Sequence, residues 1–209
     1  MSSAAGDAAG FVLAGGQSSR MGAEKALVLL RDRPLIAYAL QILRNAGLDA
    51  SIAGARSAEL AQFAPIVADI TPDRGPLGGI CAALAATSAP YAVFLSVDTP
   101  LIPVALVTHM LAHAQQTGAA VTLASVNGFA QTFPAVVDSR ALPALETALH
   151  SADRGCYAAF RGAAQALSAP LAVLSAEELP IAHPAGLAPE LWFSNINAPA
   201  DLARIELLV

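Results

Sequence analysis

The sequence has few charged residues and only two cysteines. Charged residues make up 13% of the 209 residues and hydrophobic residues 56%, so we expect no disorder beyond the termini. The cysteines, Cys81 and Cys156, stand far apart and form no Cys-x-x-Cys pair. This spacing indicates neither a zinc site nor a disulfide framework, and we interpret both residues as buried free thiols in a reducing compartment.

Long apolar runs and an excess of positive charge are also missing. The longest apolar runs are broken by Pro, Gly or a charge before they reach the length of a membrane span. A formal net charge of −5 argues against a general surface for nucleic acid or an anionic membrane. The first residues carry neither the basic nor the apolar segment of a signal peptide. We therefore expect a cytoplasmic protein without nucleic-acid or membrane partners, in which a local basic cluster would hold any phosphate-bearing ligand.

Apolar runs alternate with helix-like segments along the chain. The runs 11–13 and 91–97 are typical of buried strands, and the second is apolar on both faces, as a central parallel strand should be. Pro34 and Pro103 are placed to open helices, where their missing N–H costs little. The expected strands are 11–13, 50–53, 66–68, 91–97, 119–125, 129–137, 170–174 and 191–196. Three expected helices begin at Pro34, near Leu77 and at Pro103, and three more span 141–150, 155–167 and 199–208.

This alternation predicts an α/β fold of three layers around a mainly parallel sheet. The length fits one compact domain with a sizeable core. We expect a flexible arm over residues 1–9 and a single domain over residues 10–209.

A glycine-rich loop follows the first expected strand. Residues 13–25 are Leu-Ala-Gly-Gly-Gln-Ser-Ser-Arg-Met-Gly-Ala-Glu-Lys. Gly15 and Gly16 let the backbone approach a ligand and offer N–H groups to phosphate oxygens, while Arg20 and Lys25 supply positive charge. The loop is neither a P-loop nor a dinucleotide-binding loop, because it lacks Gly-Lys-Ser/Thr and Gly-x-Gly-x-x-Gly. On the glycines alone, an ordinary strand-to-helix turn with two solvated basic residues explains it better.

Two further motifs carry carboxylates. Asp69 lies upstream of Gly75-Pro76-Leu77-Gly78-Gly79, a rigid turn at a helix start that could read a base edge or be routine turn chemistry. Asp98 follows the strongest expected strand, at the edge where ligands bind in open parallel sheets. Mg²⁺ commonly takes one or two carboxylates together with water and substrate phosphates, which suits Asp98. Capping of a turn before Pro100 is the alternative role for Asp98.

The remaining candidates are amides and arginines in the second half of the chain. On a strand, Asn195 and Asn197 would point to one face, where they could orient a second substrate or a metal-bound water. Alternatively, Asn197 caps the last helix. Arg154 and Arg161 would share one face of a helix and could bind a second phosphate, although solvated helix charges explain them equally well.

The segment 13–25 resembles the signature of the molybdenum cofactor guanylyltransferases, which belong to the wider nucleotidyltransferase superfamily with the sugar-nucleotide pyrophosphorylases. Gly-Pro-Leu-x-Gly at 75–79, Asp-Thr-Pro at 98–100 and Asn-x-Asn at 195–197 resemble further motifs of that family. The resemblance implies a Rossmann-like nucleotidyltransferase fold with a mainly parallel, mixed sheet. It also implies that GMP passes from GTP to molybdenum-bearing molybdopterin with Mg²⁺, releasing pyrophosphate.

The resemblance also implies roles for individual residues. Arg20, Lys25 and Asp98 would be catalytic, with Asp98 on the metal. The nucleotide would lie against Leu13, Ala14, Gly15, Gly16, Lys25, Asp69, Gly75, Pro76, Leu77 and Asp98. The acceptor would lie against Arg154, Arg161, Asn195 and Asn197. The chain departs from the family at Ala198, where Thr is usual, and at Ala53, where better-matched relatives carry Asn near the nucleotide.

Three alternatives remain open from the sequence. A cytidylyltransferase acting on the same pterin would more often carry Leu-Ala-Ala-Gly and lack Gly-Pro-Leu-x-Gly. A sugar-1-phosphate nucleotidyltransferase is usually a longer chain. A silent nucleotide or cofactor carrier would not need Arg20, Lys25 and Asp98 together. The family resemblance further implies transient contact with molybdoenzymes or cofactor-insertion proteins.

Overall fold

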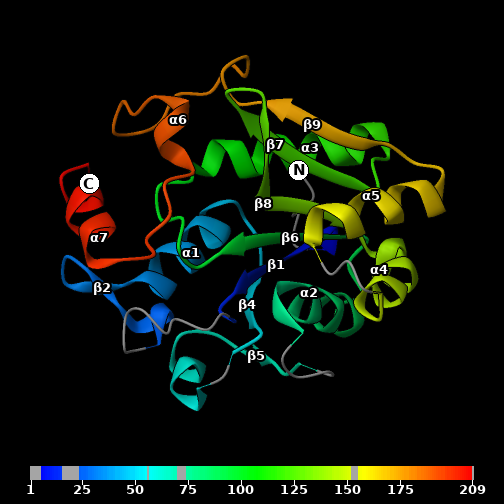
Figure 1. Ribbon diagram of the computed structural model, residues 1–209, viewed down its shortest axis with the longest axis horizontal. Coiled ribbons are helices and arrows are strands. Elements are labelled where there is room, and N and C mark those ends of the chain that lie inside the picture. Colours follow the sequence, from blue (N-terminus) through cyan, green and yellow to red (C-terminus); the bar gives the residue numbers. More distant parts are fainter. Residues whose placement is uncertain (1–5, 16–23, 56, 70–73, 152–154, 209) are drawn as a thin grey trace.

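The computed structural model describes residues 6–15, 24–55, 57–69, 74–151 and 155–208. Within these residues, seven strands form one central sheet in the order β5-β4-β1-β6-β8-β7-β9 (Figure 1). Neighbouring strands are parallel except where β8 pairs with β6 and with β7, so the sheet is mixed and mainly parallel. The strands are β1 (Ala8–Leu13), β4 (Ala50–Ala53), β5 (Ile66–Val67), β6 (Tyr91–Ser96), β7 (Val121–Val126), β8 (Phe129–Asp138) and β9 (Leu171–Ser175).

Helices cover both faces of this sheet. The helices α1 and α3 pack on one face, and α2, α4 and α5 pack on the other (Figure 1). Two short helices, α6 and α7, join the first face through buried Trp192 and Ile205. The three-layer α/β prediction is therefore confirmed. The helices are α1 (Leu35–Asn45), α2 (Gly75–Ala86), α3 (Val104–Thr117), α4 (Leu142–Leu149), α5 (Cys156–Leu167), α6 (Pro189–Trp192) and α7 (Pro199–Glu206).

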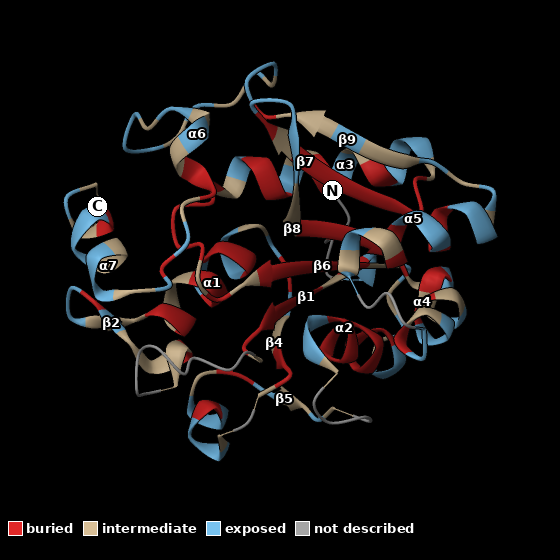
Figure 2. Cartoon of the chain, in the orientation of Figure 1, coloured by how far each residue is buried: buried red, intermediate tan, exposed pale blue. Residues whose placement is uncertain are grey.

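The central strands are buried on both sides because their side chains alternate between the two hydrophobic clusters. On β1, Val12 packs toward α1 and α3, whereas Phe11 packs toward α2. On β6, Leu95 lies in the same cluster as Val12, and Phe94 lies in the same cluster as Phe11. The Phe11 and Phe94 rings stack with centroids 5.6 Å apart. Figure 2 shows β1 and β6 in the buried colour over most of their length. Continuous apolar runs are what a strand covered on both faces requires.

Proline and glycine set helix boundaries, and the two prolines do so as the sequence predicts. Pro34 and Pro103 are the residues that precede the first turns of α1 and α3. Gly118 ends α3 in the left-handed conformation at φ 66°, which glycine adopts without steric cost. Among the described residues, no helix combines the length and apolar character needed to cross a membrane.

Most predicted boundaries lie within two residues of those observed, but two parts of the prediction fail. β1 begins at Ala8, where it pairs with Tyr91, so residues 8 and 9 belong to the sheet and not to an arm. The predicted strand at 191–196 is wrong: Pro189 opens the short helix α6, and an irregular segment follows it. The indole of Trp192 is buried and donates to the carbonyl oxygen of Leu187 at 2.9 Å, which fixes that turn. A short apolar run cannot be assigned to strand or helix by periodicity alone.

Candidate active site

The candidate site lies at the carboxyl ends of β1, β4 and β6. Leu13, the last residue of β1, is level with Ala53 of β4 and with Ser96 of β6. The alignment continues into the loops, because the N–H of Ala14 donates to the oxygen of Ala53 at 3.0 Å. Three loops therefore leave the sheet side by side at the edge where open parallel sheets bind ligands.

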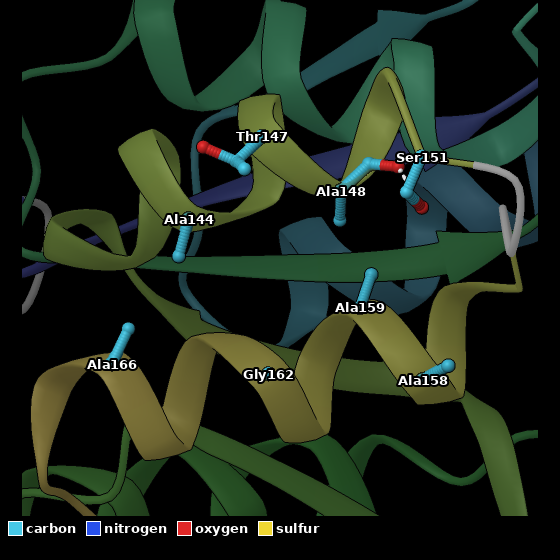
Figure 3. A pocket seen from close by; sticks show the side chains of 8 residues that line it. All are labelled: Ala144, Thr147, Ala148, Ser151, Ala158, Ala159, Gly162 and Ala166. Carbon is cyan, nitrogen blue, oxygen red and sulfur yellow. Dashed lines mark hydrogen bonds between the residues drawn. The ribbon is translucent and has the colours of Figure 1, made fainter.

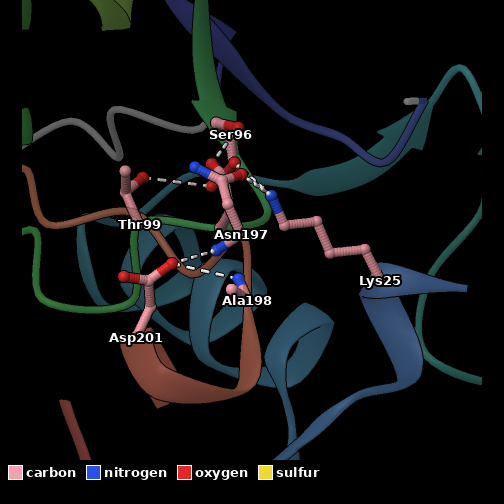
Figure 4. Close-up of polar contacts among 7 residues, drawn as sticks. Lys25, Ser96, Thr99, Asn197, Ala198 and Asp201 are labelled. Carbon is pink, nitrogen blue, oxygen red and sulfur yellow. Dashed lines mark hydrogen bonds and ion pairs between the residues drawn. The ribbon is translucent and has the colours of Figure 1, made fainter. Parts of the chain in front are cut away.

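Three residues from distant parts of the sequence meet at this edge. The ammonium of Lys25, in the short 3-10 helix η2 (Lys25–Leu27), lies 2.7 Å from Oδ2 of Asp98 and 2.6 Å from Oδ1 of Asn197 (Figure 4). The Ser96 hydroxyl donates to Oδ1 of Asp98 at 2.5 Å. The side chains of Lys25 and Asp98 are each 18% exposed, so water only partly screens the ion pair. The structure thus brings together the predicted Lys25, Asp98 and Asn197.

Backbone contacts hold the two partners of Lys25 in place. The N–H of Ile196, which is fully buried, donates to the backbone oxygen of Asp98 at 3.0 Å and ties the β6 loop to the C-terminal segment. Oδ2 of Asp201 accepts from the N–H groups of Asn197 and Ala198, both at 3.0 Å. These two hydrogen bonds, that from Asn197 foremost, lower the pKa of Asp201. Asp201 therefore caps α7 and fixes the backbone of Asn197 at once.

The donor atoms around Lys25 fit a hard divalent cation. A carboxylate oxygen of Asp98 and the amide oxygen of Asn197 converge on one positively charged nitrogen. In the described part of the chain, no group of three or more His, Cys, Asp or Glu residues could hold a metal. A cation here would have one carboxylate, with an amide oxygen, water and substrate oxygens around it. That donor set suits Mg²⁺ and does not suit Zn²⁺.

Glycines pack the first two loops closely against each other. A Cβ at Gly15 would lie 2.9 Å from the oxygen of Gly54, a distance that real Cβ atoms do not show. Gly54 has φ 71°, and a Cβ there would lie 3.8 Å from Oδ1 of Asp69. A Cβ at Gly79 would lie 3.3 Å from Cδ2 of Leu13, so α2 also lies directly against the site. Gly54 carried no signal in the sequence, because only the approach of the β1 loop explains it.

The predicted nucleotide-binding residues divide by exposure. Gly75, with φ 65°, and Pro76 are exposed at the start of α2, where a ligand can reach them. Leu13 and Leu77 are buried, and Ala53 has no exposed surface. Their side chains pack in the cluster on the α2 face, so only their backbone could meet a nucleotide. The Ala53 side chain has no exposed surface and therefore offers a nucleotide no contact.

Three predicted residues lie outside the part of the chain that the structure describes, and a fourth, Arg161, lies away from this cluster. Gly16, Arg20 and Arg154 lie outside the described residues. Arg161 is exposed in the middle of α5, which packs on α4 and β9 and lies over the other end of the sheet from the β6 arrowhead (Figure 1).

A cavity of about 320 Å³ opens directly beside Asp98. Asn195 and Asn197 both line it, although they lie on an irregular segment and not on a strand. The other lining residues include several that the sequence did not single out, because nothing local marks them. The lining residues are Ser96, Asp98, Thr99, Ala130, Gln131, Thr132, Phe133, Phe193, Asn195 and Asn197.

A second cavity, of about 460 Å³, lies between α4 and α5 (Figure 3). Its lining consists mainly of alanines, including Ala148 and Ala159. The hydroxyls of Thr147 and Ser151 donate to helix carbonyl oxygens of α4 at 2.9 and 2.8 Å. This lining offers no charge and no carboxylate, so the chemistry points to the cavity beside Asp98.

Comparisons with known proteins show which family the chain belongs to. The MobA-like NTP transferase domain family matches residues 10–173. A molybdenum cofactor guanylyltransferase of Xanthomonas euvesicatoria is 42% identical over 51% of this chain, and the match spans only 54% of that relative. The corresponding enzyme of Vibrio atlanticus is 38% identical over 68% of this chain and 75% of its own length.

Solved structures share the fold. Molybdopterin-guanine dinucleotide biosynthesis protein A from Archaeoglobus fulgidus superposes with a TM-score of 0.74 at 21% identity, over 95% of this chain and 97% of its own. A Mycobacterium tuberculosis protein solved in complex with manganese superposes with a TM-score of 0.67 at 19% identity, over 97% of this chain and 100% of its own. With its family match and its sheet-edge cluster, this chain is a nucleotidyltransferase of the MobA-like NTP transferase family, to which the molybdenum cofactor guanylyltransferases belong.

Proposed function

We propose that this chain transfers GMP from GTP to the terminal phosphate of molybdenum-bearing molybdopterin, forming molybdopterin guanine dinucleotide and releasing pyrophosphate. Membership of the family and the names of the curated relatives support this reaction. The observation that carries it is the contact of Lys25 with Asp98 and Asn197 at the sheet edge. This cluster lies between the glycine-packed loops on the β1 and β4 side and the cavity on the β8 side.

The reaction needs no nucleophilic side chain, because the attacking oxygen belongs to an acceptor phosphate that is already anionic. An oxygen of that phosphate bonds to the α-phosphorus of GTP while the bond from this phosphorus to the bridging oxygen of pyrophosphate breaks. The protein contributes position and charge. Lys25 offsets the negative charge that builds on the leaving pyrophosphate, and the backbone of Ala14 and Gly15 lies against the nucleotide.

Asp98 and Asn197 are the residues that would hold Mg²⁺. When bound, Mg²⁺ neutralises charge on the phosphate oxygens. Ser96 donates to the second oxygen of Asp98 and so fixes the orientation of the carboxylate. Asp201 holds the Asn197 backbone in the same way from the other side.

Guanine in preference to cytosine is supported by Gly15. Cytidylyltransferases of the same fold tend to carry Leu-Ala-Ala-Gly, with Ala at this position. Here a Cβ at position 15 would lie 2.9 Å from the oxygen of Gly54, so the two loops approach each other only because residue 15 is glycine. Contact with molybdoenzymes remains a prediction from the resemblance, and a cytoplasmic location remains a prediction from the sequence.

The test is release of pyrophosphate by the purified chain with molybdenum-loaded molybdopterin, Mg²⁺ and either GTP or CTP. We expect turnover with GTP and none for Asp98→Asn, with Gln116→Ala on the exposed end of α3 as the matched control. Faster turnover with CTP would reassign the nucleotide. Tight binding of both substrates without pyrophosphate would make the chain a carrier and refute the proposed reaction.

A further inference from the structure

The cavity beside Asp98 exists because β8 separates from β6. The two strands pair only from Tyr91 with Asp138 to Phe94 with Ala135. Beyond Phe94, Leu95 and Ser96 of β6 have no ladder partner on β8, and residues 130–133 line the cavity together with Ser96 and with Asp98, which follows the strand. The cavity fills that gap and reaches the Lys25 cluster at one end, because Asp98 and Asn197 line both.

An irregularity in the sheet produces the separation. On β7, Leu123 pairs with Ala135, but its neighbour Ala124 already pairs with Gln131. Residues 132–134 therefore have no partner in the β7 ladder and form a bulge. Bulges beside active sites re-aim side chains and end strand pairing. Here the bulge coincides with the place where Thr132 and Phe133 line the cavity.

The chemistry of the lining selects a class of ligand. Asp98 is the one charged residue among those that line the cavity, and it is negative. The other polar residues carry hydroxyls or amides, which donate and accept hydrogen bonds without charge. Phe193, which is 7% exposed, and Phe133 add flat apolar surface. A phosphate would find no cation among these residues, whereas a flat, uncharged heterocycle with donors and acceptors along its edge would be matched.

We propose that Gln131 selects the acceptor by its ring system, with Phe193 as the apolar wall and Asn195, which the family resemblance already assigns to the acceptor, beside it, while the acceptor phosphate lies at the Lys25 end. This inference rests on the proposed function and assigns the ring-recognition site within it. Gln131 comes from the residue where the β7 ladder breaks, and Asn195 comes from the segment after α6. In the free protein, the amide nitrogen of Gln131 donates to the oxygen of Phe129 at 3.0 Å, a local hydrogen bond that a ligand can replace.

The first test separates the two substrates kinetically. In the pyrophosphate assay, Gln131→Ala and Asn195→Ala should each raise the KM for molybdopterin roughly tenfold, as expected for loss of one hydrogen bond, and leave the KM for GTP within about twofold. Gln116→Ala should change neither value. A fold defect would lower the Tm and change both KM values, so the Tm of each variant is measured alongside. An unchanged KM for molybdopterin in Gln131→Ala would overturn the inference, whatever Asn195→Ala shows.

The second test needs no turnover. Binding of 6-hydroxymethylpterin, a fluorescent pterin without phosphate, is titrated against the wild type and Gln131→Ala. We expect saturable quenching in the wild type, a weaker effect in the variant and no competition from inorganic phosphate. Competition by phosphate, or equal binding by both proteins, would contradict recognition of the ring. If the wild type bound the pterin but released no pyrophosphate with any acceptor, the proposed function would be refuted, whereas recognition of the ring would remain supported.

Discussion

Replacing Lys25 with methionine should slow turnover and, in the absence of nucleotide, strengthen cation binding. The ammonium lies where the oxygens of Asp98 and Asn197 converge, at 2.7 and 2.6 Å, so it occupies the place that a divalent cation would take. In the free protein, a metal must displace it. Methionine keeps most of the side-chain volume and removes the competing charge.

The two magnitudes follow from the same geometry. Loss of one aligned electrostatic donor typically costs about 10²–10³-fold in kcat. A metal that enters the free protein must break the contact between Lys25 and Asp98, whose side chains are each 18% exposed. Breaking this charge-assisted contact costs about 1–2 kcal/mol, which is roughly tenfold in the Kd of the metal. The variant should therefore bind Mn²⁺ about tenfold more tightly than the wild type when no GTP is present.

The assays are pyrophosphate release for turnover and electron paramagnetic resonance titration of Mn²⁺ for the cation, with Lys25→Arg as the charge-preserving control. A Met variant that turned over within a few-fold of the wild type would refute the catalytic role. Equal or weaker Mn²⁺ binding by the Met variant would refute the competition between Lys25 and the metal.

Lys25 is also the single lysine of the chain, so MgGTP should protect this one lysine from acylation.

Three further predictions concern other parts of the structure. Because its hydrogen bonds to the backbone lower the pKa of Asp201 in the folded state, it stabilises the fold above its unfolded pKa, and this contribution disappears as pH falls through the lowered value. The Tm difference between wild type and Asp201→Ala should therefore be present at pH 7 and shrink in acid, and a pH-independent difference would argue against this role. Gly15→Ala should weaken the thermal shift by MgGTP, since its Cβ would meet a carbonyl oxygen at 2.9 Å, whereas Gly162→Ala, with open space around it, should leave that shift unchanged. Cys81 is buried as predicted, whereas Cys156 is only half-buried, which corrects that prediction. Burial raises the pKa of both thiols to about 11, so native protein should react slowly with iodoacetamide at pH 8 and denatured protein rapidly. Fast native alkylation would show that the thiols are accessible.

The sequence predicted the sheet edge well because its signals are local. A strand buried on both faces must be apolar along its length, which identified β6. Parallel strands bring their carboxyl ends to one edge, so the positions of Lys25 and Asp98 after two such strands were enough to predict that they lie near each other. The strand at 191–196 failed because Leu191-Trp192-Phe193 has no period that separates strand from helix.

The rest of the site depends on registers and long-range packing. Gln131 lines the cavity only because three residues of β8 fall out of the β7 ladder, and no pattern around it predicts that shift. Gly54 matters only because the β1 loop approaches it. The role of Asp201 could have been predicted from the sequence. An acidic residue three positions after the residue that precedes a helix is a known capping pattern, and Ala198 and Asp201 stand in these two positions.

The contact between Lys25 and Asn197 joins residues 172 positions apart. The family match ends at residue 173, so the amide that completes the cluster lies beyond the matched region. A chain cut between Ser175 and Asn197 would keep the strands of the central sheet and Lys25. It would lose Asn197, and it would also lose Asp201, whose carboxylate fixes the Asn197 backbone. During synthesis the centre can therefore form only after the C-terminal segment has been made, and a chain trimmed before Asn197 would lack one of its three members.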